Sequence, residues 1–432
     1  MRVRADVLAA ARAYVEGSEL EVLVVSGGAH PLPRSGRWPH WRLVWLLVGL
    51  VAAAGVAVAL DRTAFSGTQA VSSAPKDVQN SVQALVGGSV PGALLFVRQG
   101  DRSYTVTAGY AEKATKRPMR AGDTFPIGST TKAFTAVLVM RLVAQGKIAL
   151  DDPVAKYLPA LRPDGSRITI RELLSHTSGL PEFVDDPLFL APYMRGNFGY
   201  AWTPKQMVAF AAAGPLAFAP GTKFSYSSTN YVVLALLAER VGGRSYEKQL
   251  TDYILRPLKL EHTSLPASNK TLPDVHGYVG LAARGRADGA GNFDSAALTP
   301  AFAWSAGGIR ATAEDEADFF RGLFSGKLLP AAQVAAMEDT SATGGAYGLG
   351  IMPTGGHESA WRAFTQVITT RCGRAWGHGG AFPGYYQLPI SSPDGSRQAV
   401  LLVNTEEELL SVAQFKQVYN VLATAYCRGV PS

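Results

Sequence analysis

Hydrophobic and polar residues follow two rhythms along this chain, and the first is that of β-strands. Residues 93–98 and 103–108 are rich in apolar and β-branched positions, with Gln-Gly-Asp-Arg between them, which predicts a β-hairpin. From Ser129 to about Lys259 the apolar positions instead recur at helical spacing, interrupted by Pro and Gly. This stretch predicts four helices, at residues 133–145, 205–213, 230–241 and 246–254.

Strands return near the C-terminus, after two more predicted helices at residues 311–324 and 330–338. Residues 384–389 and 398–404 predict two strands joined by the turn Ser392-Pro-Asp-Gly. A last amphipathic helix is predicted from about residue 407 to residue 426. Strands at both ends with helices between them predict an α+β fold, in which the two ends build one sheet and a helical region is inserted.

One segment near the N-terminus has a different pattern. Residues 43–60 carry no charge, and at about 1.5 Å per residue they nearly cross a hydrocarbon core of about 30 Å. Arginines precede the run, so the positive-inside rule predicts a membrane-anchored chain. Residues 1–42 would be cytoplasmic, 61–77 a linker and 78–432 the catalytic domain outside the cytoplasm. The alternative is a signal peptide cleaved near Ala57-Val58-Ala59, which would make the domain secreted.

Composition narrows the classes of partner. The 432 residues are 47% hydrophobic and 17% charged, which suits a large globular body. The net charge of +7 is spread out, with no run of five like charges and no Arg-rich arm, so a nucleic-acid partner has no support. Two cysteines cannot supply a four-ligand zinc site, and no H-E-x-x-H occurs, so neither a metal nor a cofactor is expected. The oligomeric state is left open.

Ser129 and Lys132 are the first candidate catalytic residues. A lysine three residues after a serine lies one helical turn away on the same face. The apolar run that follows, residues 133–144, places this helix in the core. A buried lysine loses its charge readily, and a neutral amine can take the proton of a serine hydroxyl. The alternative is an N-cap serine followed by a solvated lysine.

Two later segments add candidates. Tyr226 stands just ahead of an apolar helix, where a tyrosine can pass a proton to a leaving group, although residues 227–229 also suit a helix N-cap. Residues 376–381, Trp-Gly-His-Gly-Gly-Ala, place His378 among glycines. Glycines let the backbone approach a ligand and present N–H groups to a developing oxyanion. A glycine-rich turn with an incidental histidine is the alternative.

Taken together, Ser129-x-x-Lys132, Tyr226 and His378-Gly-Gly follow the order and approximate spacing of a known set of motifs. The chain resembles the serine β-lactamase-like, penicillin-binding superfamily over about residues 80–428. It looks closest to the branch of DD-carboxypeptidases and class C β-lactamases, which also holds D-aminopeptidases and carboxylesterases. The resemblance implies the β-lactamase-like fold, an antiparallel sheet flanked by helices with an inserted all-helical region and the active site in the cleft between.

The resemblance also implies roles in an acyl-enzyme mechanism. Ser129 attacks the carbonyl carbon, Lys132 and Tyr226 exchange the proton, and His378 supports them electrostatically. The backbone N–H groups of Ser129 and Ala381 form the oxyanion hole. The candidate substrate-binding residues are Ser228, Gly379, Gly380, Phe302 and Trp304, the last two as an aromatic wall. Residues 303–307 are expected to end an inner strand that lines the cleft.

Two positions depart from the family's motifs. Ser228 stands where the second motif has an asparagine that helps bind the substrate amide. Gly379 stands where the third motif has a threonine or serine whose hydroxyl binds a substrate carboxylate. The missing hydroxyl favours esters and neutral-ended amides over peptides that end in a free carboxylate.

The predicted function is therefore an exported, membrane-anchored serine hydrolase that cleaves amide or ester bonds, in the manner of a D-Ala-D-Ala carboxypeptidase. Small peptides, amides or esters, including cell-wall peptides, are the expected substrates. A carboxylesterase or D-aminopeptidase is one alternative, and a penicillin-binding or sensor-like module with poor turnover is another. Cys372 and Cys427 are expected to pair in an oxidising compartment, with two buried free thiols as the alternative.

Overall fold

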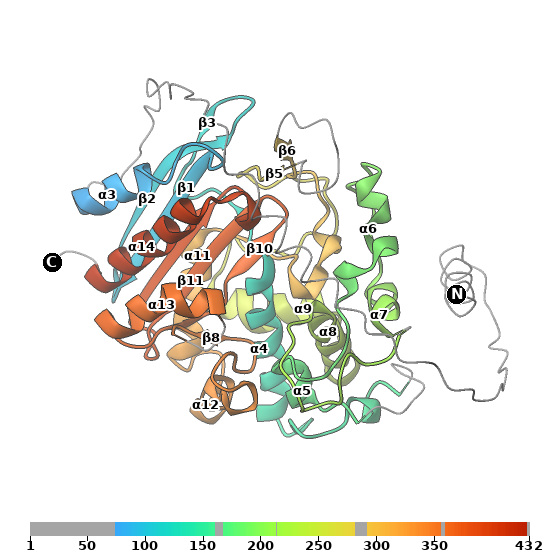
Figure 1. Ribbon diagram of the computed structural model, residues 1–432. Helices are drawn as coiled ribbons and strands as arrows, with labels where there is room; N and C mark the ends of the chain where they lie inside the picture. The colour runs from blue at the N-terminus through green and yellow to red at the C-terminus, as the bar shows by residue number, and fades with distance from the viewer. Residues whose placement is uncertain (1–73, 160–166, 213, 281–291, 356–358, 430–432) are drawn as a thin grey trace, which may run out of the picture. The chain divides into compact units, whose positions relative to one another are not determined.

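The computed structural model describes residues 74–159, 167–212, 214–280, 292–355 and 359–429. At the centre of this part lies one antiparallel sheet in the order β3-β2-β1-β12-β11-β9-β8, with β10 paired to β11 (Figure 1). Its strands are β1 (Gly92–Gln99), β2 (Arg102–Glu112), β3 (Arg117–Pro118), β8 (Met352–Pro353), β9 (Trp376–Gly377), β10 (Gly380–Phe382), β11 (Tyr385–Ser391) and β12 (Arg397–Val403).

The sheet joins the two ends of the described chain. The predicted hairpin is β1–β2, in which Phe96 lies opposite Thr105, and on its other side Phe96 lies opposite Val400 of β12. Strand β1 is buried from Gly92 to Arg98, because it is a central strand covered on both faces. The prediction of one sheet built from both termini is confirmed.

Helices cover both faces of this sheet. On one face lie α3 (Lys76–Gln83), α13 (Ser359–Cys372) and α14 (Val412–Arg428), which share an apolar core with Leu95, Val97 and Leu401. On the other face α11 (Ala313–Phe324) packs against β12 and β11. Alternate residues of β1 thus enter different cores, as the two-residue period of a strand requires.

The helical region lies beyond α11 and shares its core. The sequence pattern predicted its main helices, and their bounds differ by only a few residues. The region holds α4 (Thr131–Ala144), α5 (Ile170–Leu174), α6 (Pro187–Met194), α7 (Pro204–Ala212), α8 (Ser228–Gly242), α9 (Tyr246–Leu250), α10 (Arg256–Leu258) and α12 (Ala331–Glu338). The chain between α9 and α10, Thr251–Leu255, forms one π-helical turn. Helix α8 ends at Gly243, whose φ of 67° suits a glycine C-cap.

Two local predictions were wrong. The last helix begins at Val412 rather than near residue 407, because Ser411 and Gln414 form a capping box that sets its start. Residues 304–306 form a 3-10 turn instead of the end of an inner strand. The cause is the backbone of Trp304, whose φ of 39° lies in the left-handed region and is incompatible with an extended strand.

The predicted membrane localisation also needs correction. Within the described residues, no helix combines the length and the apolarity that crossing a bilayer requires. Residues 43–60, on which the prediction rested, lie outside the described residues.

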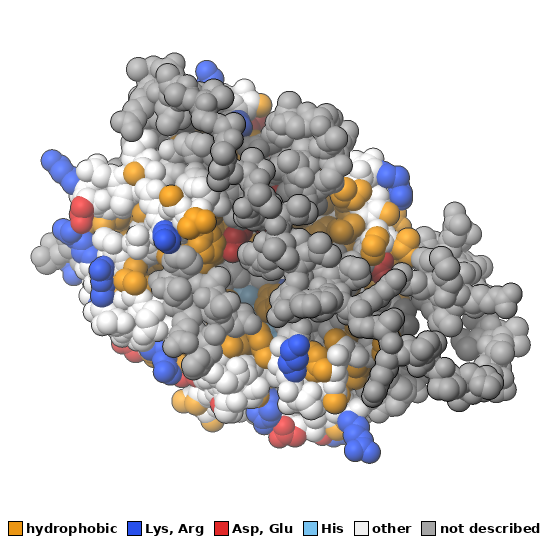
Figure 2. Space-filling view, in the orientation of Figure 1, with side chains coloured by type: hydrophobic (Ala, Val, Ile, Leu, Met, Phe, Trp, Pro, Cys, Tyr) orange, Lys and Arg blue, Asp and Glu red, His pale blue; other side chains and the backbone are white. Residues whose placement is uncertain are grey.

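Charge on the visible face agrees with the sequence composition. Lys and Arg side chains are scattered over that face rather than gathered in one patch (Figure 2). A nucleic-acid surface would instead concentrate basic side chains on one face or stripe.

Candidate active site

The predicted nucleophile and its lysine are in direct contact. Ser129 lies in a 3-10 turn, Gly128–Thr130, that leads straight into α4. Lys132 is in the first turn of that helix, and its Nζ donates to Ser129 Oγ at 3.0 Å and to the carbonyl oxygen of Ala306 at 2.8 Å. The 3-10 turn of residues 304–306 therefore provides the second hydrogen-bond partner of the amine.

Burial controls the charge of Lys132. Its side chain is 1% exposed, and this desolvation lowers its pKa from 10.5 to about 7, against the influence of the nearby Glu182, which raises it. At neutral pH a substantial fraction of the amine is thus unprotonated. An unprotonated amine 3.0 Å from a hydroxyl is placed to act as its general base.

Tyr226 completes the group at the mouth of the site. It directly precedes α8 and is 38% exposed. The Nζ of Lys132 lies 4.8 Å from the centre of its ring. The buried ring of His176 lies against it, with 4.2 Å between ring centres, and His176 Nδ1 accepts the backbone N–H of Ser227 at 3.1 Å. His176 therefore has the structural, hydrogen-bonding role and fixes the segment that carries Tyr226.

His378 is a neutral residue in this site. Its side chain is buried, and desolvation lowers its pKa to about 3. Its Nδ1 donates to the carbonyl oxygen of Gly379 at 2.8 Å, so Nε2 accepts from the hydroxyl of Tyr347 at 2.9 Å. His378 thus supports the site through hydrogen bonds and packing rather than through a positive charge. Sequence reasoning assigned Tyr347 no role in the site.

The glycines after His378 let β10 meet the nucleophile turn. A side chain on Gly380 would collide with the carbonyl oxygen of Ile127, and one on Gly128 would collide with that of Ala381. Thr130 Oγ1 also donates to the carbonyl oxygen of His378 at 2.6 Å. The backbones of Ser129 and Ala381 are therefore neighbours, as an oxyanion hole made from their N–H groups requires.

Glu182 occupies a place that sequence reasoning missed. Its Oε2 accepts the backbone N–H of Ser228 at 2.6 Å, at the position where the resemblance would have an asparagine. Burial raises the pKa of this carboxyl, although the hydrogen bond and the charge of Lys132 oppose the shift. A carboxyl group that interacts electrostatically with Lys132 thus lies within the candidate site.

The two aromatic candidates have different surroundings. Phe302 packs against Phe382 of β10 at 6.0 Å and Tyr193 at 5.0 Å between ring centres, so it can form a wall beside the oxyanion hole. Trp304 instead directs its indole N–H to Glu247 Oε1 at 2.8 Å. The indole is engaged with the helical region, and its effect on the site passes through the backbone turn that contacts Lys132.

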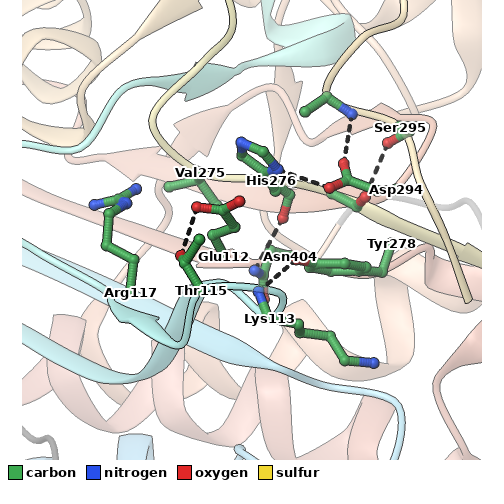
Figure 3. A network of polar contacts seen from close by, with 12 residues as sticks. Glu112, Lys113, Thr115, Arg117, Val275, His276, Tyr278, Asp294, Ser295 and Asn404 are labelled. Carbon is green, nitrogen blue, oxygen red and sulfur yellow. Dashed lines mark hydrogen bonds and ion pairs between the residues drawn. The ribbon is translucent and has the colours of Figure 1, made fainter.

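A polar network fastens the turn between β10 and β11 (Figure 3). Two short strands, β5 (Tyr278–Gly280) and β6 (Asn292–Asp294), pair beside this turn, and the N–H of Tyr278 donates to Gly384 at 3.2 Å. His276 points toward Asp294, with 2.7 Å between Nδ1 and Oδ2. Asn404 at the end of β12 donates to the carbonyl oxygen of His276 at 3.0 Å. The network ties the central sheet to the turn that follows Ala381.

The two cysteines form a disulfide, Cys372–Cys427, with 5.3 Å between their Cα atoms. It links the end of α13 to the end of α14. Both cysteines belong to the core on the sheet face away from α4. The bridge is therefore remote from the nucleophile.

Comparison with known proteins gives the context of this geometry. The family model described as Beta-lactamase matches residues 78–417. Among solved structures, a D-stereospecific amidohydrolase from Streptomyces sp. is 32% identical, with a TM-score of 0.67, and the match covers 80% of this chain and 97% of that one. This similarity confirms the predicted β-lactamase-like fold.

Curated proteins match over shorter stretches. Esterase EstB from Burkholderia gladioli is 35% identical over 215 residues, which are 47% of this chain and 54% of the esterase. Protein flp from Staphylococcus aureus (strain MW2) is 29% identical over 199 residues, 44% of this chain and 38% of that protein. The matches thus span about half or less of these relatives' own length.

Proposed function

Because the chain belongs to the Beta-lactamase family, we propose that it is a serine hydrolase that cleaves amide or ester bonds through an acyl-enzyme on Ser129. The observation that carries this proposal is the 3.0 Å contact between Lys132 Nζ and Ser129 Oγ. Burial keeps the amine of Lys132 close to neutral, so it can accept the hydroxyl proton as the oxygen attacks.

The proposed reaction has two halves. In the first, Ser129 Oγ bonds to the carbonyl carbon, its proton passes to Lys132, and the carbonyl electron pair moves onto oxygen. The N–H groups of Ser129 and Ala381 stabilise that oxyanion. The carbon–leaving-group bond then breaks, and the leaving group takes a proton through Tyr226. In the second half, water attacks the acyl carbon and gives a proton to Lys132. The bond between the acyl carbon and Ser129 Oγ then breaks, and Lys132 returns the proton to Oγ.

The substrates that the site favours are amino-acid amides rather than peptides with a free C-terminal carboxylate. Gly379 offers no hydroxyl to such a carboxylate. Glu182, beside Lys132, instead suits the positive α-amino group of an amino-acid amide. The similar Streptomyces protein is by name a D-stereospecific amidohydrolase, which supports amides of D-amino acids as the first class to test.

Esters are the second candidate class. The similarity to Esterase EstB favours them, and an acyl-enzyme mechanism accepts esters as readily as amides because the alkoxide leaves more easily than an amine. An ester without an amino group would not use Glu182. The two classes can therefore be separated by a single variant.

The test measures hydrolysis by the full chain and by its Ser129→Ala variant. The substrates are D-phenylalanine amide, its N-acetyl derivative, p-nitrophenyl acetate and a peptide ending in D-Ala-D-Ala. We expect Ser129→Ala to lower turnover by at least roughly 10⁴-fold, because no other nucleophile replaces the hydroxyl. Mass spectrometry after fluorophosphonate treatment should find the adduct on Ser129.

The Glu182→Gln variant tests the substrate class. It should lower kcat/KM for D-phenylalanine amide about 10- to 100-fold more than kcat/KM for the N-acetyl derivative, which shares any effect of the variant on Lys132; this factor is the value of a hydrogen bond to a charged group. Glu261→Gln, an exposed glutamate outside the site, is the control. Near-normal hydrolysis by pure Ser129→Ala would reject the nucleophile. Efficient release of D-Ala from the peptide, with little amidase or esterase activity, would reject the substrate class.

A further inference from the structure

Glu316 is a buried acid directly behind the nucleophile turn. It lies on α11 with no exposed surface, and desolvation raises its pKa from 4.5 to about 8. The side chains that act on its carboxyl are those of Thr130 and Gln387, and both oppose this rise of the pKa. Neither carboxyl oxygen has a hydrogen-bond donor in good geometry. An acid in this environment lowers the stability of the fold, because a leucine at the same position would avoid the cost of desolvation. Its presence therefore indicates a role other than stability.

Its two neighbours hold the backbone of the active site. Thr130 Oγ1 donates to the carbonyl oxygen of His378 at 2.6 Å. Gln387 Nε2 donates to the carbonyl oxygen of Ile127 at 2.8 Å and to Thr130 Oγ1. The hydrogens of these side chains are thus already used, while Gln387 Oε1 is buried without a partner. The cluster contains more acceptors than donors, and one further proton would balance it.

We propose that Glu316 is a positioning residue, whose carboxylic acid proton is donated to the Thr130–Gln387 pair and so fixes the nucleophile turn against β10. The inference rests on the proposed function, since the positioned groups are Ser129 and the oxyanion hole. Thr130 follows the nucleophile, and the carbonyl of His378 precedes the glycines that lead to Ala381. A shift of either backbone would therefore misalign the attacking oxygen and the oxyanion donors.

The charged groups near α11 do not neutralise an ionised Glu316, because each has other partners. Arg98 of β1 pairs with Glu314 and Asp318, and Arg256 of α10 pairs with Asp252. Arg397 of β12 donates to the carbonyl oxygen of Tyr426, and Asp315 accepts hydrogen bonds from Thr263 and His262. The charge of Lys132 interacts with Glu182. Ionisation would thus leave a buried charge without a counter-ion.

The consequence is an alkaline limit to activity. When the pH rises through the pKa of Glu316, the acid loses the proton that the cluster needs, and the nucleophile turn loosens. Lys132 sets the opposite limit, because its amine must be neutral. The rate of attack by Ser129 should therefore peak between pH values of about 7 and about 8, where Lys132 is unprotonated and Glu316 still carries its proton.

The experiment follows the rate of labelling of Ser129 by a fluorophosphonate in the full chain, because this probe does not titrate and needs no natural substrate. We expect at least a roughly tenfold fall between pH values of about 8 and about 10. Glu316→Gln keeps an N–H donor but cannot ionise, so it should label within about threefold of the unmodified rate and lose the alkaline fall. Glu316→Leu supplies no donor and should label at least roughly tenfold more slowly at every pH.

Glu407→Gln is the matched control, because Glu407 is another carboxyl whose pKa burial raises, to about 7, and it acts on Tyr386 and Tyr419 of the core on the other sheet face. It should keep the alkaline fall. An equal alkaline fall in folded Glu316→Gln, or labelling of Glu316→Leu at the unmodified rate, would overturn the inference alone. No labelling of the unmodified chain at any pH would overturn the proposed function, and this inference with it.

Discussion

Lys132 is the residue at which burial has the greatest chemical effect. An ammonium group taken out of water loses its hydration, and among the described residues Glu182 is the carboxylate that acts on its charge. The two hydrogen bonds of its Nζ go to a hydroxyl and a carbonyl, which do not replace a counter-ion. The result is a base that is largely unprotonated just above neutral pH, at the side of its serine.

A prediction for the acid side of the pH profile follows. The labelling rate of Ser129 should rise with pH through about 7, as Lys132 loses its proton. The charge of Glu182 raises the pKa of Lys132, so Glu182→Gln should move this rise to lower pH. Glu261→Gln should leave it in place. A rise that moves to higher pH in Glu182→Gln would show that the coupling has the opposite sign.

At this scale, sequence could predict only contacts that are local or carried by motifs. Ser129 and Lys132 lie one helical turn apart, so their contact follows from spacing alone. Glu182 meets Ser228 across 46 positions, and a glutamate between Pro and Phe carries no sign of that contact. Glu316 stands in an acidic first turn, where carboxylates ordinarily face solvent and favour the helix N-terminus. Only packing places it inside.

At the scale of elements, the short strand pair β5–β6 connects the central sheet to the turn between β10 and β11. Hydrophobic pattern did not predict these three-residue strands, since they are too short to show a period. Their position depends on side chains instead. His276 and Asp294 lie at their ends, and the carboxylate raises the pKa of the histidine through their hydrogen bond.

The hydrogen bond between His276 and Asp294 makes the free energy of unfolding depend on pH in a defined direction. A histidine whose pKa is raised by folding stabilises the folded state fully below its unfolded pKa, about 6.5, and loses that contribution as the pH rises through its higher folded value. His276→Gln should therefore lower the Tm at about pH 6 more than at about pH 9. His262→Gln is the control, because His262 hydrogen-bonds to a carboxylate, that of Asp315, through its backbone N–H rather than through its ring. An equal loss at both pH values would contradict the prediction.

Long elements were predicted well for a physical reason. Helices α4 and α8 bury most of their surface, and apolar runs as long as theirs suit few structures other than a buried helix. The turn at residues 304–306 was read wrongly because an apolar run of that length also suits a strand end. Its conformation is set by contacts from distant elements, including the bond from Lys132 to Ala306 and that from Trp304 to Glu247.

At the scale of the whole molecule, two cores lie on opposite faces of one sheet, and the chemistry belongs to one of them. The core with α4, α8 and α11 carries Ser129 and Lys132, while α3, α13 and α14 fill the other. Sequence predicted the sheet from strands at both ends of the chain. It could not predict which helices cover which face, because that follows from long-range packing.

The Cys372–Cys427 disulfide is a covalent link beside the core that α3, α13 and α14 fill. It closes a loop between two residues 55 positions apart, which contains β9, β10, β11 and β12, so it restricts the unfolded chain over much of the sheet. The chain-entropy model gives about 4 kcal/mol for such a loop, as an upper figure. Cys372→Ser, Cys427→Ser and the double variant should each lose up to that free energy of unfolding in urea, and by equal amounts, because each removes the same bridge.

The catalytic face should be affected much less. The labelling rate of Ser129 in the folded Cys372→Ser/Cys427→Ser protein should stay within about threefold of the unmodified rate, because both cysteines pack against the core on the other face of the sheet. The measurement pairs urea unfolding with thiol counting on denatured protein made in an oxidising compartment. Two reactive thiols in the unmodified chain would refute the bridge. A large loss of labelling at full stability would show that the two faces are coupled through the sheet, since β11 and β12 contribute side chains to both cores.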